Sequence, residues 1–165
     1  MFELKLLTLA AVPKALDRAE RYRFLNEPGE AESICLDVLQ VQPDDQRALV
    51  TLLLALTDQF EGPSVDIRRS QEVLVRLHGE YERAYYGGII CERRANAVLR
   101  HGGPHSRFMA YDLFQEALRR YQKAEAIRPP ENDDAILRWN TCVRILASHP
   151  ELENAPDERV ELPLE

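Results

Sequence analysis

Apolar residues in this chain recur at intervals of three and four, as they do along one face of an α-helix. Prolines, glycines and acidic pairs divide this pattern into seven stretches. No stretch alternates apolar and polar residues over the length of a strand. The pattern therefore predicts an all-α protein. We expect helices over residues 13–25, 30–41, 48–56, 64–77, 80–100, 106–127 and 135–148.

One short signature occurs twice at the same spacing. Its steps of four, three and five residues place three members on one helical face and a proline just beyond the helix end. A helix hairpin that repeats in this way cannot bury its own apolar face, so it must stack on a neighbour. The two copies are Ala31, Cys35, Val38 and Pro43, then Ala117, Tyr121, Ala124 and Pro129.

This arrangement resembles the tetratricopeptide repeat over residues 12–149. Pairs three residues apart on the first helices agree with the family's pattern: Ala19 with Tyr22, Leu53 with Leu56, Gly88 with Cys91, and Trp139 with Cys142. The resemblance implies an α-solenoid of about three antiparallel helix hairpins plus a C-terminal capping helix. The chain departs from the pattern where the second unit lacks its closing proline and the third has extra residues over 101–107.

Gly87 and Gly88 lie inside the fifth predicted helix, where each costs about 1 kcal/mol relative to alanine. We expect the backbone of a neighbouring helix to approach closely there.

Residues 1–11 form an apolar extension before the repeats. Residues 150–165 are acidic, contain Pro156 and Pro163 after the initial Pro150, and lack helical periodicity, so we expect a loose, disordered tail.

The three cysteines, Cys35, Cys91 and Cys142, each lie in an apolar helical stripe. Their odd number and wide spacing favour buried free thiols over disulfides and indicate a reducing compartment. The N-terminus lacks the features of a signal peptide, and no run is long enough to span a bilayer. We expect a cytoplasmic protein without membrane contact.

Charge and motifs argue against several function classes. The net charge is -7, and no basic stripe with interleaved aromatic residues occurs, so nucleic acid is not an expected partner. His101 and His105 are separated by Gly-Gly-Pro, which prevents a helical metal site. No phosphate-binding loop or catalytic triad pattern is present. We therefore expect neither an enzyme nor a cofactor.

The resemblance also implies that the first helices of the hairpins line a concave, peptide-binding groove. The chain lacks the basic clamp with which some relatives hold the C-terminal carboxylate of chaperones, since Leu16, Glu20, Glu82 and Tyr86 stand at the clamp positions. We expect a non-catalytic scaffold that binds a protein or peptide segment. The groove residues in register are Arg47, Val50, Thr51, Leu54, Tyr85, Tyr86, Ile89, Arg93, Asn140 and Arg144.

We further expect Tyr86 and Arg93 to lie outside the helix–helix core, and Arg119 and Arg120 to lie on the outer side of the stack.

A second hypothesis for the function is a self-associating structural protein, a homo-oligomer in which the leucine-rich residues 2–12 pack against another copy.

Overall fold

The protein folds into seven α-helices and one 3₁₀ turn over the residues that the computed structural model describes, 2–62 and 66–152. The described part contains no strand, and the prediction of an all-α protein is confirmed. The elements are the turn Leu9–Ala11, α1 (Val12–Phe24), α2 (Pro28–Val41), α3 (Gln46–Asp58), α4 (Ile67–Leu74), α5 (Glu80–His101), α6 (Ser106–Ala126) and α7 (Asp134–Ser148).

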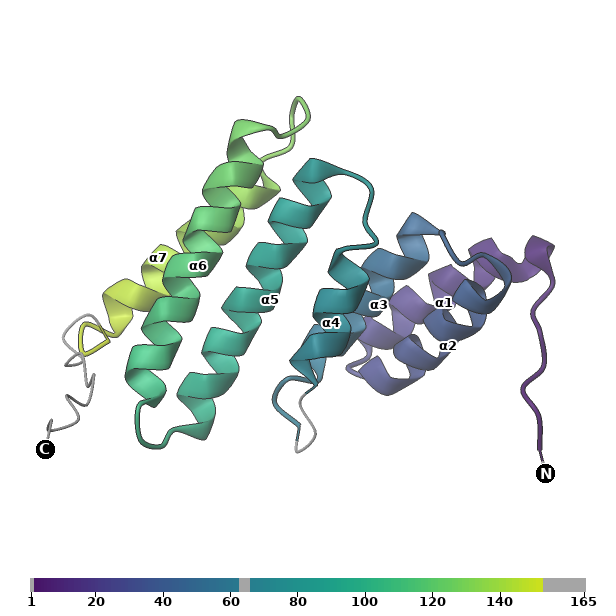
Figure 1. Ribbon diagram of the computed structural model, residues 1–165, viewed down its shortest axis with the longest axis horizontal. Coiled ribbons are helices and arrows are strands. Elements are labelled where there is room, and N and C mark those ends of the chain that lie inside the picture. Colours follow the sequence, from purple (N-terminus) through teal and green to yellow (C-terminus); the bar gives the residue numbers. More distant parts are fainter. Residues whose placement is uncertain (1, 63–65, 153–165) are drawn as a thin grey trace, which may run out of the picture.

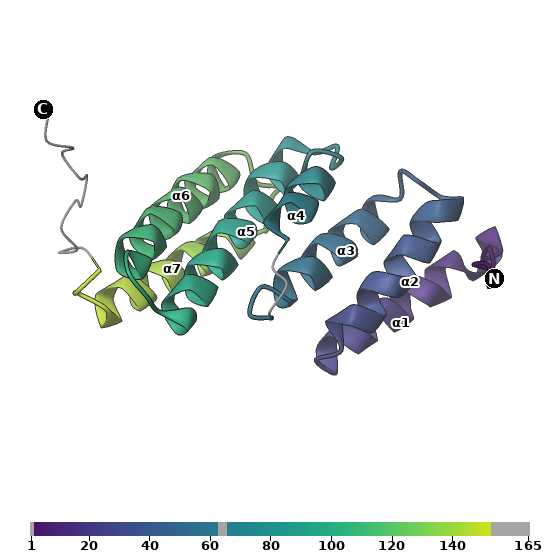
Figure 2. The same ribbon diagram turned by 60° about the horizontal axis from the view of Figure 1, so that its bottom comes forward.

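The helices pack in chain order along a row. Each of α1, α2 and α3 contacts the helix that follows it, as do α5 and α6. In addition α1 contacts α3, and α3 contacts α5, so these three odd-numbered helices adjoin one another. Figures 1 and 2 show α1 and α7 at opposite ends of this row.

Local signals explain several helix starts. Pro28 occupies the first turn of α2, where its missing N–H costs nothing. The backbone N–H of Ala48 donates to Asp45 Oδ1 at 2.8 Å and caps α3. Asn132 Oδ1 accepts from the N–H of Asp134 at 3.0 Å at the start of α7. The fourth helix is shorter than the predicted 64–77, and residues 64 and 65 lie outside the described part.

Two large apolar clusters meet within the row. One cluster joins α1 to α5, and the other joins α5, α6 and α7. Leu54 and Tyr86 are half-buried and pack against both clusters. These two side chains therefore connect the N-terminal and C-terminal halves of the core.

Gly88 on α5 lies directly beneath the ring of Tyr121 on α6. A Cβ at Gly88 would stand 2.5 Å from Tyr121 Cε1 and 2.7 Å from Cδ1. Tyr121 has no exposed surface, so its ring has little room to move away. The expected close approach does occur, but a buried aromatic ring makes it rather than the backbone of the neighbouring helix.

The packed core extends past the predicted boundary at residue 149. Leu152 is buried in the cluster of α5, α6 and α7, and its N–H donates to the carbonyl of His149 at 3.0 Å. The expectation of a loose tail from residue 150 is therefore wrong for Leu152. Residues 153–165, on which the rest of that expectation falls, lie outside the described part.

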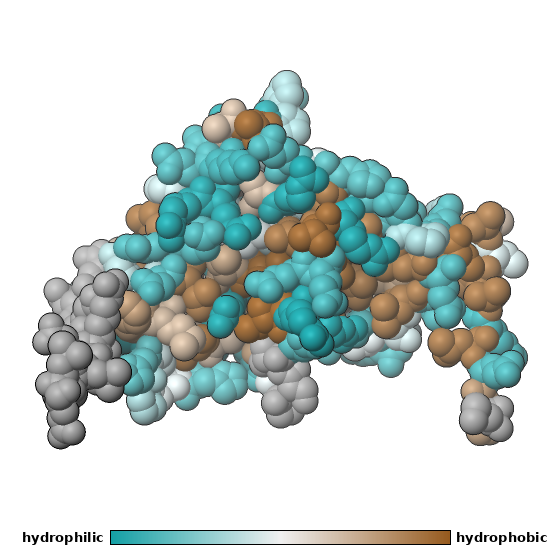
Figure 3. Space-filling view, viewed as in Figure 1, coloured by the Kyte–Doolittle hydropathy of each residue, from teal (hydrophilic) through white to brown (hydrophobic). Residues whose placement is uncertain are grey.

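The apolar N-terminal extension is largely uncovered. Leu7 packs partly against a small cluster that includes Val12 and Leu16. The remaining large apolar side chains of the extension face solvent, and Figure 3 shows apolar surface at this end of the row. They are Phe2, Leu4, Leu6 and Leu9.

The cysteines differ in burial. Cys35 and Cys142 are fully buried, as predicted, whereas Cys91 is partly exposed. Burial raises the pKa of Cys35 and of Cys142 to about 12, and it also raises the pKa of Cys91. All three thiols are free.

We predict that Gly88→Ala lowers the free energy of unfolding by about 1–3 kcal/mol, because the added methyl overlaps the buried Tyr121 ring. Gly87→Ala is the matched control. Its Cβ would meet only the flexible end of Arg120, so it should be neutral or up to about 1 kcal/mol stabilising. Urea denaturation measures both. Equal stability of the two variants would contradict the close packing described above.

We predict that Leu152→Ala destabilises the protein by about 2 kcal/mol or more, since it empties a buried site. A chain shortened to residues 1–152 keeps this contact and should melt like the full chain. A chain shortened to 1–149 should melt at a lower temperature. Differential scanning calorimetry distinguishes the three, and equal melting of the two shortened chains would place Leu152 outside the core.

We predict that Cys91 reacts first with a thiol reagent in the native protein at about pH 8, because alkylation and disulfide exchange require the thiolate. Cys35 and Cys142 should react only after unfolding, since burial both shields them and raises their pKa. Mass spectrometry after timed labelling identifies the modified residues. Labelling of Cys35 at the rate of Cys91 would contradict this packing.

Candidate protein-binding face

Arg47 on α3 forms ion pairs with two carboxylates of α1. Its Nη2 donates to Asp17 Oδ1 at 2.7 Å, and its Nε donates to Glu20 Oε1 at 2.8 Å. These pairs are largely solvent-exposed, so each contributes less than about 1 kcal/mol. They nevertheless fix where the guanidinium of Arg47 lies and satisfy its charge.

Asp58 at the end of α3 joins three helices. Arg23 from α1 donates its Nε to Asp58 Oδ2 at 2.7 Å, and Arg93 from α5 donates to Oδ1 of the same carboxylate. Arg93 also donates to Thr57 Oγ1 at 2.6 Å and to the carbonyl of Leu54 at 3.2 Å. Asp58 therefore holds α1, α3 and α5 in a fixed order.

Arg93 is embedded among these groups. Burial lowers its pKa, and the neighbouring Asp58 carboxylate acts in the opposite direction. A guanidinium remains charged even when its pKa falls, because its ordinary value is far above neutrality. Arg93 therefore stays a cation whose donors are directed into the protein.

Glu92 on α5 is a buried carboxylate that joins the last three helices. The hydroxyl of Tyr121 on α6 donates to Glu92 Oε2 at 2.6 Å, and Arg138 Nη1 on α7 donates to Oε1 at 3.2 Å. Burial raises the pKa of Tyr121, and the nearby carboxylate raises it further. The phenol therefore keeps its proton and acts as the donor to Glu92.

Three tyrosines of α5 form a cluster near the start of α7. The rings of Tyr81 and Tyr85 are stacked with centroids 5.8 Å apart, and Tyr86 meets Tyr85 edge-on at 5.1 Å. Tyr81 donates its hydroxyl to Asn132 Oδ1 at 3.2 Å. Burial raises the pKa of each tyrosine, that of Tyr86 to about 12, so all three remain neutral hydroxyls.

These contacts define a surface that we call the odd-helix face, and they draw some predicted groove residues together. Leu54, Tyr86 and Arg93 meet where α3 packs against α5. Thr51 and Ile89 are buried and cannot touch a ligand in this conformation. The predicted residues with exposed or half-exposed side chains on the odd-numbered helices constitute the face: Arg47, Val50, Leu54, Tyr85, Tyr86, Arg93, Asn140 and Arg144.

Asn140 and Arg144 belong to the face through their register on α7. They follow Trp139 by one and five residues, as Leu54 and Asp58 follow Leu53. Both are exposed. The hydrogen bond between α7 and Glu92 on α5 is made by Arg138 rather than by either of them.

The expectation that Tyr86 and Arg93 lie outside the helix–helix core is wrong. Tyr86 packs against both apolar clusters, and Arg93 bridges α5 to α3. The reason is that the odd-numbered helices lie close enough for long side chains to reach between them. On the other side of the stack Arg119 is exposed as expected, whereas Arg120 is only partly so and covers Gly87.

Sequence reasoning missed three residues that organise the face: Asp58, Glu92 and Arg138. A signal for Glu92 was present, because it lies four residues after Gly88 and three before Ala95, both on the packed stripe of α5. A carboxylate in such a stripe needs a buried partner. The partner itself, Arg138, lies 46 residues away, and local spacing does not identify it.

The described residues contain no group of three or more histidine, cysteine, aspartate or glutamate side chains that could hold a metal ion. His101 ends α5, and His105 precedes α6 in the left-handed conformation. None of the helices in the described part is long and apolar enough to cross a membrane.

Comparison with known protein families, with curated proteins and with solved structures finds no match for this chain.

Proposed function

We propose that the protein is a tetratricopeptide-like α-solenoid that binds an extended peptide or protein segment on its odd-helix face, without catalysis or a cofactor. One observation carries the proposal. Polar links run without a break from α1 to α3 through Arg23 and Asp58, from α3 to α5 through Arg93, and from α5 to α7 through Glu92. These links connect the four odd-numbered helices to one another.

The groups left over for a ligand indicate what kind of segment suits this face. Arg47 and Arg93 already form ion pairs with carboxylates of the protein, so they offer little additional charge to a ligand. Arg144 makes no ion pair with a described residue, and Asn140 is exposed beside it in the helical register. An asparagine can donate to and accept from a peptide backbone, and an arginine can bind a carboxylate.

The half-buried Leu54, Tyr85 and Tyr86 add apolar contact area and neutral hydroxyls. Tyrosine and arginine are the residues that most often anchor a partner at an interface. The matching segment is an extended peptide with an acidic side chain opposite Arg144 and an apolar one opposite the tyrosines.

The test uses peptides selected from a random library on the wild-type protein. We predict that Asn140→Ala combined with Arg144→Glu weakens these peptides by at least about tenfold, because it removes the unengaged polar groups of the face. Both residues are exposed, so the fold should be unchanged. Fluorescence anisotropy with labelled peptides measures the affinity.

The matched control is Gln122→Ala combined with Arg119→Glu on α6, which removes one amide and reverses one arginine on the opposite side of the stack. It should leave the peptide affinity within about twofold of wild type. Loss of binding in this control with normal binding in the α7 variant would assign the peptides to the outer surface. The odd-helix face would then have to be abandoned.

A further inference from the structure

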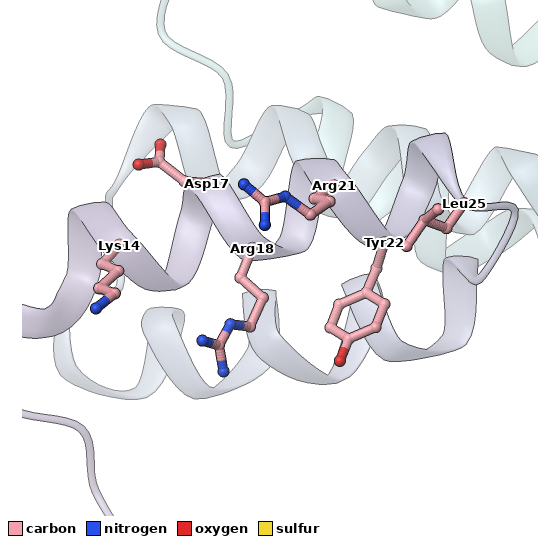
Figure 4. A pocket seen from close by; sticks show the side chains of 6 residues that line it. All are labelled: Lys14, Asp17, Arg18, Arg21, Tyr22 and Leu25. Carbon is pink, nitrogen blue, oxygen red and sulfur yellow. The ribbon is translucent and has the colours of Figure 1, made fainter.

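The first helix carries a cationic surface at the open end of the row. Lys14, Arg18, Arg21 and Leu25 follow one another at steps of four, three and four residues, so they share one side of α1. With Asp17 and Tyr22 they line a hollow of about 380 Å³. Figure 4 shows that five of the six side chains come from α1, that Leu25 lies directly after its last residue, and that the side chains of Lys14, Arg18 and Tyr22 extend to the same side of the helix.

A second hollow adjoins the first. It measures about 270 Å³, and Lys14 and Arg18 line both. Its other walls are largely apolar and come from the N-terminal extension, α1 and α2: Leu7, Ala11, Ala15 and Ile34, with Asp37. Two cations thus stand between an apolar hollow on one side and Tyr22 with Leu25 on the other.

These cations are not paired within the part of the chain that the structure describes. Lys14, Arg18 and Arg21 make no ion pair with a described residue, and the neighbouring Asp17 is engaged by Arg47. The equivalent side of α3 is covered by α1 and α2, whereas α1 is the first helix of the row. The surface we call the α1 end face, Lys14, Arg18, Arg21, Tyr22 and Leu25, is therefore open and positively charged.

The chain itself contains a segment that complements this face. Residues 153–165 contain five acidic residues and one arginine, with Val160, Leu162 and Leu164 among them. Acidic groups would meet Lys14 and Arg18, and apolar ones would enter the hollows on either side. We propose that the α1 end face binds the acidic segment 153–165 of a second copy of this chain.

A second copy fits better than the chain's own segment because of the path. Residue 152 is anchored near α7, at the opposite end of the row from α1. To reach α1, the segment after residue 152 would have to cross three helix-to-helix distances of about 9 Å each, past α5 and α3. This path requires about eight residues in extended conformation. Few of the thirteen would remain for binding, whereas a second copy offers all of them. Such a contact is head-to-tail, so it builds chains of copies unless it closes into a ring.

The first experiment measures mass against concentration by light scattering. In about 0.05 M salt the wild-type mass should rise with concentration, and in about 0.5 M salt it should return to that of the monomer, because exposed charges are screened. Lys14→Glu combined with Arg18→Glu should remain monomeric in both. A full-length tail variant should behave likewise, and it carries Glu153→Gln, Asp157→Asn, Glu158→Gln and Glu161→Gln.

The matched control reverses one lysine and one arginine elsewhere, by Lys123→Glu with Arg68→Glu. Both side chains are mostly exposed, and the change in net charge is the same. This variant should associate like wild type, which separates a specific surface from general repulsion.

The second experiment adds a labelled synthetic peptide of residues 153–165 to the full-length tail variant, whose α1 end face is intact. The peptide should bind, and Lys14→Glu with Arg18→Glu in that background should weaken it by at least about tenfold. A peptide with its acids replaced by amides should not bind.

Three results would overturn the proposal. The first is a wild-type chain that stays monomeric in low salt and a peptide that fails to bind. In the second, the peptide binds the tail variant, whereas the wild-type protein stays monomeric and does not bind the peptide. That result would mean that the chain's own segment occupies the face. In the third, association persists in both the α1 and the tail variants, which assigns it to another surface such as residues 2–9.

Discussion

The buried carboxylate of Glu92 is the constraint on which the C-terminal half of this protein depends. A charge removed from water requires partners, and Glu92 has two that come from different helices, Tyr121 and Arg138. The same Tyr121 presses its ring onto Gly88, so one side chain satisfies the charge and fixes the spacing of α5 and α6. Helix α7 is then aligned on α5 by the remaining bond through Arg138.

Asp58 plays the corresponding part in the N-terminal half, where it gathers Arg23 and Arg93. The two centres are adjacent on α5, because Glu92 and Arg93 are consecutive residues. As a result the groups that set the order of these helices are already engaged within the protein. In the binding mode that we propose, a partner would use the exposed side of α7 and the half-buried tyrosines.

The two ends of the row differ chemically. At one end α1, the first α-helix of the described residues, exposes Lys14, Arg18 and Arg21. At the other end α7 is covered in part by Leu152, and the sequence that follows is acidic. A row whose ends carry opposite charge can join copies in one direction without using the odd-helix face.

The sequence by itself determined the all-α class, the presence and most bounds of the seven helices of the described part, and the close approach at Gly88. These depend on neighbours within one or two helical turns, and period, caps and glycines report such neighbours directly. Only the tertiary structure decided that Arg93 and Tyr86 belong to the core, that Arg138 donates a hydrogen bond to Glu92, and that Leu152 is buried. Their partners are far away in the sequence, and which long side chains meet depends on how closely and at what offset the helices pack.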